Sequence, residues 1–185
     1  MWLVLLIWVI VIFGATIFIS QYIKMYQRED VAIALYILFI TMSQILAVKI
    51  GDFSIGNFQI TAPVAVLIFP FTFQITDMVN ENFGQKKTHR MIFIAFITQI
   101  IMVVFIWFSI EISGASFWGF DWDSDPIEAQ RFWENFLGST LRITAASWIA
   151  FLITENLDAV LFAKFKKLTK DRNLWLRNVF SDIPT

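Results

Sequence analysis

The sequence predicts an all-α fold, a polytopic bundle of membrane helices, and three observations support this. The chain is 58% hydrophobic and 16% charged, with a mean hydropathy of +0.68, whereas soluble domains carry about 25% charged residues. Apolar runs recur along the chain at about the 20-residue length that a helix needs to cross a bilayer. The 21 Phe and 8 Trp residues suit a lipid-facing surface with aromatic belts at both interfaces.

Five segments are expected to span the membrane. The first covers about residues 2–23, which carry no charge and lack the basic start and small-residue cleavage site of a signal peptide. The second covers about 31–50 and the third about 58–82. The fourth covers about 91–112 and the fifth about 140–165. The lipid bilayer is therefore the first expected partner.

Basic residues predict the orientation of these spans. Two follow the first span, three follow the third and six follow the fifth, so that 11 of the 14 Lys and Arg residues lie on alternate loops. The positive-inside rule places those loops in the cytoplasm. We therefore expect a protein of the plasma membrane whose N-terminus lies outside the cell. The net charge of −1 gives no sign of nucleic-acid binding. These residues are Lys24, Arg28, Lys86, Lys87, Arg90, Lys164, Lys166, Lys167, Lys170, Arg172 and Arg177.

The segment 113–139 is predicted to be an external, amphipathic loop rich in acidic and aromatic residues. Asp125, Pro126 and Glu128 have the types expected at the N-cap, N1 and N3 positions of a short helix, and Gly138 suits its end. We expect an interfacial lid at the level of the lipid headgroups. A substrate vestibule is the alternative.

Pro70 interrupts the third predicted span. Because proline cannot donate a backbone hydrogen bond, a kink is predicted there. Broken helices whose freed polar groups line a cavity recur in secondary transporters. The alternative is a packing kink below which Asp77 and Glu81 reach the cytoplasmic interface.

Polar side chains follow the proline at helical spacing. Gln74, Asp77 and Glu81 share one helical face, and Phe73 and Asn80 flank it. A carboxylate at membrane depth costs about 2.5–3.5 kcal/mol on insertion scales, so such residues are rarely without function. A substrate-binding site is therefore predicted on this segment.

The fifth predicted span carries a second set of polar residues. Its outer half is rich in small residues that favour close helix packing. Glu155 and Asp158 lie deeper in the span, and Arg142 lies about one turn in from the outer end. Arg142 either snorkels to the interface or faces an anion in a cavity.

The residue types favour a binding site over a catalytic one. Carboxylates and amides accept hydrogen bonds from a planar donor edge such as that of a guanine-like base, although a cation, an amine or a proton relay suits them equally. With no Cys and one His, we expect no catalytic set, no metal site and no cofactor. His89 is expected to be a solvated residue of a basic loop.

Three stretches resemble the queuosine precursor transporter family of the vitamin uptake transporter group. They are FPFTFQITDMVNENFG at 69–84, which is similar to the family's Pro-x-x-Phe-x-x-Thr-Asp…Gly signature, LRITAAS at 141–147 with the following ITENLDAVLF, and LRNVFS at 176–181. The resemblance covers about 31–185 and leaves 1–30 as an additional N-terminal helix and loop. Glu155 departs from the Gln expected there.

The resemblance implies a six-helix core that imports 7-deazaguanine bases, such as 7-cyano-7-deazaguanine, for tRNA modification. Two family helices would lie beyond Thr185, so we expect a longer protein. Eight positions match family motifs: Phe73, Thr76, Asp77, Glu81, Arg142, Asp158, Asn178 and Ser181.

The leading hypothesis is thus a transporter in which Asp77, with Glu81 or Asp158, holds the donor edge of the base, Phe73 stacks on it and Gln74 orients it. The alternatives are a substrate-binding subunit of an ATP-driven importer, a carrier for another donor-rich solute, and a channel. A homodimer is one functional unit that the sequence allows. The full predicted binding set is Phe73, Gln74, Thr76, Asp77, Asn80, Glu81, Arg142, Glu155, Asp158, Asn178 and Ser181.

Overall fold

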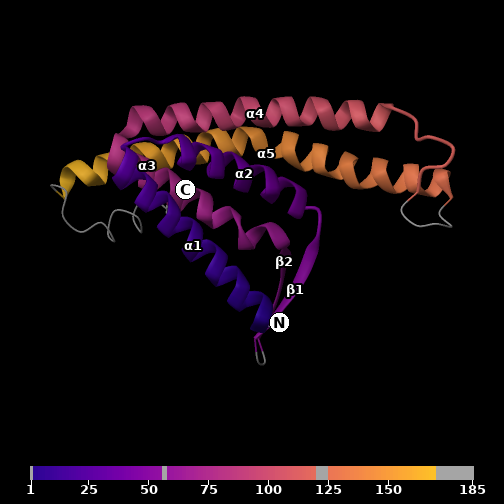
Figure 1. The fold of residues 1–185 in the computed structure, drawn as a ribbon, viewed down its shortest axis with the longest axis horizontal. Helices are drawn as coiled ribbons and strands as arrows, with labels where there is room; N and C mark the ends of the chain where they lie inside the picture. Colours follow the sequence, from indigo (N-terminus) through magenta and orange to yellow (C-terminus); the bar gives the residue numbers. More distant parts are fainter. Residues whose placement is uncertain (1, 56–57, 120–124, 170–185) are drawn as a thin grey trace.

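Five α-helices, one 3-10 helix and a β-hairpin make up the computed structural model of the chain, which describes residues 2–55, 58–119 and 125–169. The predicted fold class is confirmed, since the hairpin is a small part of a helical molecule (Figure 1). The elements are α1 (Trp2–Tyr26), α2 (Asp30–Leu46), β1 (Ile50–Ile55), β2 (Phe58–Pro63), the 3-10 helix (Val64–Leu67), α3 (Phe69–Phe83), α4 (Gln85–Glu111) and α5 (Pro126–Leu168).

Three of the helices, α1, α4 and α5, are long and apolar enough to cross a membrane. They correspond to the first, fourth and fifth predicted spans. The shorter α2 has 17 apolar residues and α3 has 15 residues. At 1.5 Å per residue, α3 is about 22 Å long, which is less than the hydrocarbon thickness of a bilayer.

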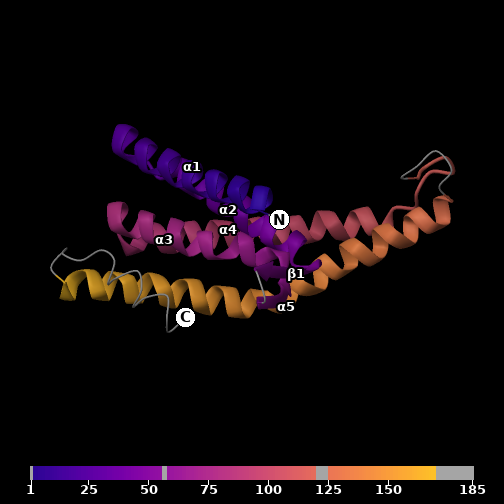
Figure 2. The ribbon, with the colours of Figure 1, turned by 90° about the horizontal axis from the view of Figure 1, so that it is seen from below.

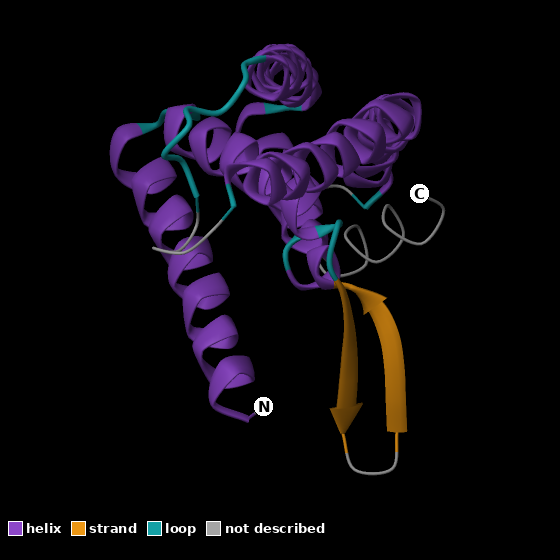
Figure 3. Cartoon of the chain, turned by 90° about the vertical axis from the view of Figure 1, so that its right-hand side faces the viewer, coloured by secondary structure: helices purple, strands orange, loops and turns teal. Residues whose placement is uncertain are grey.

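The predicted helical spans 31–50 and 58–82 are wrong at their adjoining ends, where the chain forms a hairpin. β1 and β2 pair antiparallel, with Asp52 opposite Thr61, and the Thr61 hydroxyl donates to the Asp52 carboxylate at 2.6 Å. Figure 3 shows the hairpin projecting away from the helices. The strands are joined by the dipeptide Gly-Asn, a composition that favours a two-residue hairpin connection.

The predicted kink at Pro70 is also wrong, because α3 begins there. Pro70 lies in the first turn of α3, directly after the 3-10 helix. In a first turn the backbone N–H groups have no intrahelical acceptor, so the missing N–H of proline removes no hydrogen bond. The polar residues of α3 therefore lie on a regular helix.

A glycine makes the sharp turn from α3 to α4. Gly84 has a φ of 82°, a conformation that favours glycine, and its N–H donates to the Asn80 carbonyl at 3.0 Å. Because α4 begins at the next residue, the basic residues predicted to lie in a loop here belong to the first turns of α4.

The helix predicted to end at Gly138 continues for 43 residues as α5. Its start is as expected, since the Asp125 carboxylate accepts from the Ile127 N–H at 3.0 Å. A glycine inside a helix costs only about 1 kcal/mol, and α5 packs along α4. Trp118 meets Trp133 edge-on at 6.0 Å between ring centroids and closes this helical hairpin.

The basic segments meet at one end of the molecule. The end of α1, the α3–α4 turn and the end of α5 lie together, at the left of Figure 1. Ion pairs join these segments: Lys87 pairs with Glu29, and Lys166 lies 3.5 Å from a Glu81 carboxylate oxygen. We call this the basic end.

The molecule is apolar outside and partly polar inside. Large apolar side chains are exposed along α1, α4 and α5, which suits contact with lipid chains. Buried positions include many polar side chains, and these set the location of the candidate sites: Ser43, Gln44, Thr72, Thr76, Asp77, Asn80, Thr88, Gln99, Thr140, Thr144, Glu155 and Asp158.

Candidate functional site

Helix α3 presents polar side chains to two neighbours. It lies between α1 and α5 (Figure 2). The face with Gln74, Asp77 and Glu81 borders a groove shared with α1. The face with Thr72 and Thr76, one helical turn apart, lies against α5. Predicted binding residues of α3 thus lie on two different faces of one short helix, with Gln74, Asp77 and Glu81 on one and Thr76 on the other.

The first group lines the groove between α1 and α3, a cavity of about 260 Å³. Asp77 is only 3% exposed, Glu81 is half-buried and Gln74 is exposed. The structure therefore brings these three predicted residues to one cavity and keeps the Asp77 carboxylate away from the surface. The remaining lining residues are Thr16 and Ser20 of α1 and Met78 and Asn82 of α3.

The second group is a buried cluster between α3 and α5. Glu155 and Asp158 are fully buried. The Thr72 hydroxyl lies 3.4 Å from a Glu155 carboxylate oxygen, and the Thr76 hydroxyl lies 3.4 Å from one of Asp158. Each hydroxyl also donates at 2.7 Å to a backbone carbonyl of α3, and this shorter bond is the stronger one.

Sequence reasoning missed two members of this buried cluster. Thr72 was detectable, because it lies one helical turn before Thr76 on the same face. Tyr36 of α2 is fully buried, and its hydroxyl lies beside the carboxylates of Glu155 and Asp158. It gave no signal, since an aromatic residue within an apolar run usually packs in a core.

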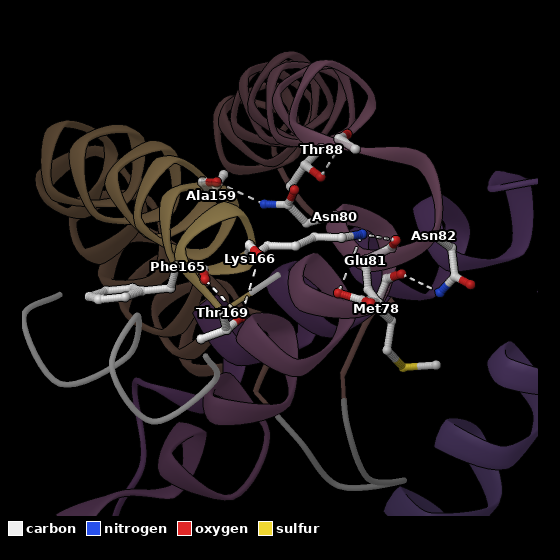
Figure 4. Close-up of polar contacts among 10 residues, drawn as sticks. Met78, Asn80, Glu81, Asn82, Thr88, Ala159, Phe165, Lys166 and Thr169 are labelled. Carbon is white, nitrogen blue, oxygen red and sulfur yellow. Dashed lines mark hydrogen bonds and ion pairs between the residues drawn. The ribbon is translucent and has the colours of Figure 1, made fainter. Parts of the chain in front are cut away.

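The predicted residues Asn80 and Glu81 contact α5. The Asn80 amide donates to the Ala159 carbonyl at 2.8 Å, and Lys166 reaches back to the Glu81 carbonyl at 2.6 Å (Figure 4). With the ion pair from Lys166 to Glu81, these bonds fix the end of α3 against the end of α5.

The other predicted residues lie outside both groups. Phe73 is half-buried and packs edge-on against Phe69, with 5.5 Å between ring centroids. Arg142 is exposed and donates to the Ser139 hydroxyl at 3.3 Å, so the structure does not bring it to either group. Asn178 and Ser181 lie outside the described residues.

The expectation that His89 is a solvated loop residue is wrong. It is half-buried in α4 and its Nδ1 lies 2.6 Å from Oδ1 of Asn156. The Asn156 amide nitrogen donates to the Leu152 carbonyl, so Oδ1 is the acceptor and His89 carries its proton on Nδ1. Nε2 then accepts from Gln85 at 3.0 Å. The histidine ties α4 to α5.

No group of His, Cys, Asp and Glu side chains among the described residues has the arrangement needed to hold a metal ion. Both polar groups instead supply hydrogen-bond acceptors, and the carboxylates of Asp77, Glu155 and Asp158 are buried. There a carboxylate interacts with a donor more strongly than it does in water. The arrangement can bind a donor-rich solute.

Comparison with known proteins gives three results. Residues 63–184 match the family described as "Putative vitamin uptake transporter". A "Probable queuosine precursor transporter" of Bacillus subtilis is 25% identical over 122 residues, which cover 65% of this chain and 49% of the relative. A protein of the same description from Haemophilus influenzae is 26% identical over 113 residues, which cover 61% and 43%.

The chain spans about half the length of the curated relatives it matches. No solved structure gives a significant match.

Proposed function

Because the chain belongs to the vitamin uptake transporter family through residues 63–184, we propose that it imports a queuosine precursor across the cytoplasmic membrane. The cargo would be a 7-deazaguanine base such as 7-cyano-7-deazaguanine. The descriptions of the two relatives support this cargo. The family is one of transporters rather than enzymes, in agreement with the expectation from the residue types.

The single observation that carries the proposal is the buried Asp77 beside a cavity that Gln74 and Glu81 also line. A guanine-type base presents a ring N–H next to an exocyclic amine, and one carboxylate accepts both bonds. The cavity of about 260 Å³ is smaller than the roughly 300–1,000 Å³ typical for drug-sized ligands, which suits a single fused ring system.

The proposed roles follow from position. Asp77 binds the donor edge of the base, while Gln74 and Glu81 orient it from the same helical face. Glu155 and Asp158 form a second acceptor pair on the other side of α3. Because both groups flank one short helix, a displacement of α3 would alter both at once.

The direct test is uptake of labelled 7-cyano-7-deazaguanine by cells that make the full-length protein with Asp77→Asn. Loss of a charge-assisted hydrogen bond of about 1.5–3 kcal/mol predicts a fall in initial uptake of about 10- to 150-fold. Glu128→Gln, the same chemical change at an exposed position of α5, should leave uptake unchanged. Undiminished uptake by Asp77→Asn, at equal amounts of protein in the membrane, contradicts the proposed site.

A second measurement distinguishes a carrier from a subunit of an ATP-driven importer. The purified full-length protein is placed in liposomes without ATP, and entry of the labelled base is followed. Entry into the liposomes supports a carrier. Binding of the base without entry favours the subunit and rules out transport by this protein alone.

A further inference from the structure

A second cavity lies at the basic end and takes no part in the proposed transport site. It has a volume of about 530 Å³ and lies between the α3–α4 turn and the last turns of α5. Lys86 of α4 and Lys166 and Lys167 of α5 line it, together with Gly84 and Gln85 of the turn. No carboxylate of the described residues lines it.

The three lysines differ in how they are held. Lys166 is half-buried and fixed by its contacts with Glu81, which Figure 4 shows at the edge of this region. Lys86 and Lys167 are exposed, and neither forms an ion pair with another described residue. Two ammonium groups thus remain available to a ligand, beside a third whose position is fixed.

The backbone adds to the positive potential of this cavity. Helix α4 starts at its wall with no side-chain cap on its first turn. The first N–H groups of a helix have no intrahelical acceptor and carry the positive end of the helix dipole, so they favour an anion. Gly84 has no Cβ, and nothing described lies within 4 Å of where one would be, so a ligand can approach the backbone there.

The positive-inside rule accounts for lysines at this end in general, since Lys24 and Lys164 follow it as well. It does not explain why three of them line one cavity. Phe83 and Ala163 provide an apolar side to the same cavity. A basic cavity with an apolar side, at the level where helices leave the membrane, has the chemistry of a headgroup site.

We propose that this cavity binds a phosphate-bearing anion through Lys86, Lys166 and Lys167. The phosphate belongs either to an anionic phospholipid of the adjacent leaflet or to a soluble phosphate compound. No residue of the α1–α3 groove lines this cavity, although Lys166 pairs with Glu81 of the groove. The test therefore changes Lys86 and Lys167, which make no ion pair with a described residue of the groove.

The test uses the purified full-length protein in detergent. Bound phosphatidylglycerol is counted by native mass spectrometry, and the thermal stabilisation that the lipid gives is titrated. Phosphatidylcholine provides the zwitterionic comparison. At about 1 kcal/mol for each basic residue near a membrane surface, the double variant Lys86→Gln, Lys167→Gln should weaken phosphatidylglycerol binding by about 30-fold. Both residues are exposed, so the variant is expected to fold.

The matched control is Lys24→Gln, Lys164→Gln, which removes two charges from the same end at positions outside the cavity. It should keep the wild-type affinity within about twofold. Equal weakening in the two double variants would mean that general surface charge attracts the lipid, and would overturn the proposal. Equal binding of phosphatidylcholine would also overturn it.

Competition with inorganic phosphate distinguishes a phospholipid headgroup from a soluble phosphate compound as the ligand. If it displaces phosphatidylglycerol, and its own binding is weakened in the Lys86→Gln, Lys167→Gln variant, the site takes soluble phosphate. If the lipid binds with the expected dependence on these lysines and phosphate does not displace it, the ligand is a headgroup. If neither binding depends on these lysines, the proposal is wrong.

Discussion

Asn80 and Asn82 lie two residues apart on α3 and make different kinds of hydrogen bond. The amide of Asn80 is buried and donates across to the Ala159 carbonyl of α5. The amide of Asn82 is exposed and donates to the Met78 carbonyl of its own helix. Substituting each residue in turn therefore compares the loss of a hydrogen bond between two helices with the loss of one within a single helix.

Asn80→Ala should therefore lower the free energy of unfolding by about 1 kcal/mol, the usual scale of an interhelical hydrogen bond in a membrane protein. Asn82→Ala should change it by less than half of that. Thermal unfolding of both variants in the same detergent measures the difference. Equal stability of the two variants would show that the bond to Ala159 does not hold α3 against α5.

The residues of the candidate site were predictable from the sequence only in part. Gln74, Asp77 and Glu81 were recoverable because charge and amide groups at helical spacing in an apolar segment are conspicuous. The division of α3 into two polar faces was not, since it depends on which helix packs against each face. Tyr36 joins the buried cluster from a segment more than 35 residues away in sequence.

At the scale of the elements, the predicted helices were wrong where a local strand or turn signal lay within a stretch of high hydropathy. The alternating pattern and the Gly-Asn dipeptide of the hairpin lie within an apolar stretch, where a helical span was assumed. At Pro70 and Gly138 the error was the reverse, because the local residue type was given too much weight. Each was predicted to be a break. Pro70 instead starts a helix, because proline is favoured in a first turn, and Gly138 lies within one, where packing against α4 outweighs its low helix propensity.

The α1–α2 connection is tied to α4 by an ion pair that titrates. The hydrogen bond and ion pair with Lys87 hold the pKa of the Glu29 carboxyl below its usual range, against the opposing effect of its partial burial. A lowered pKa contributes stability above the unfolded-state pKa, about 4.3, and this stability is lost as the pH falls through the folded-state value.

Glu29→Gln should accordingly be less stable than the wild type at pH 7, by about 0.2–1 kcal/mol. The difference should shrink as the pH falls below about 4.3 and should vanish only below the lowered folded-state pKa, where Glu29 is protonated in both states. Thermal unfolding of the variant and the wild type at several pH values from 7 to 3.5 measures this difference in stability. Glu111→Gln changes an exposed carboxylate with no ion pair among the described residues and should match the wild type at pH 7. A difference between Glu29→Gln and the wild type that is as large at pH 3.5 as at pH 7 would refute the titration.

At the scale of the whole molecule, the arrangement of charge gives a prediction about orientation. All basic segments described in the structure lie at one end, and the acidic start of α5 lies at the other (Figure 1). We expect the basic end to face the cytoplasm. These 185 residues contain no cysteine, so a cysteine introduced among them is the only one in this part of the protein.

Glu128→Cys should react with a membrane-impermeant maleimide in intact cells, and Lys24→Cys should react only after the membrane is made permeable. Both residues are exposed in the structure, so access to the reagent depends on the side of the membrane. The reverse labelling pattern would place the N-terminus in the cytoplasm and would move every loop to the opposite side of the membrane.

The groove beside Asp77 is formed by two segments, of which only one lies in the part of the chain that matches the family. Gln74, Asp77 and Glu81 come from the part of the chain that matches the family, whereas Thr16 and Ser20 come from α1, which precedes that part. Helix α1 adds little to the buried core. Under the proposed function, exchanging the hydroxyl side chains of α1 should therefore change which cargo is accepted while leaving the carboxylates in place, so this helix is the first target for changing selectivity.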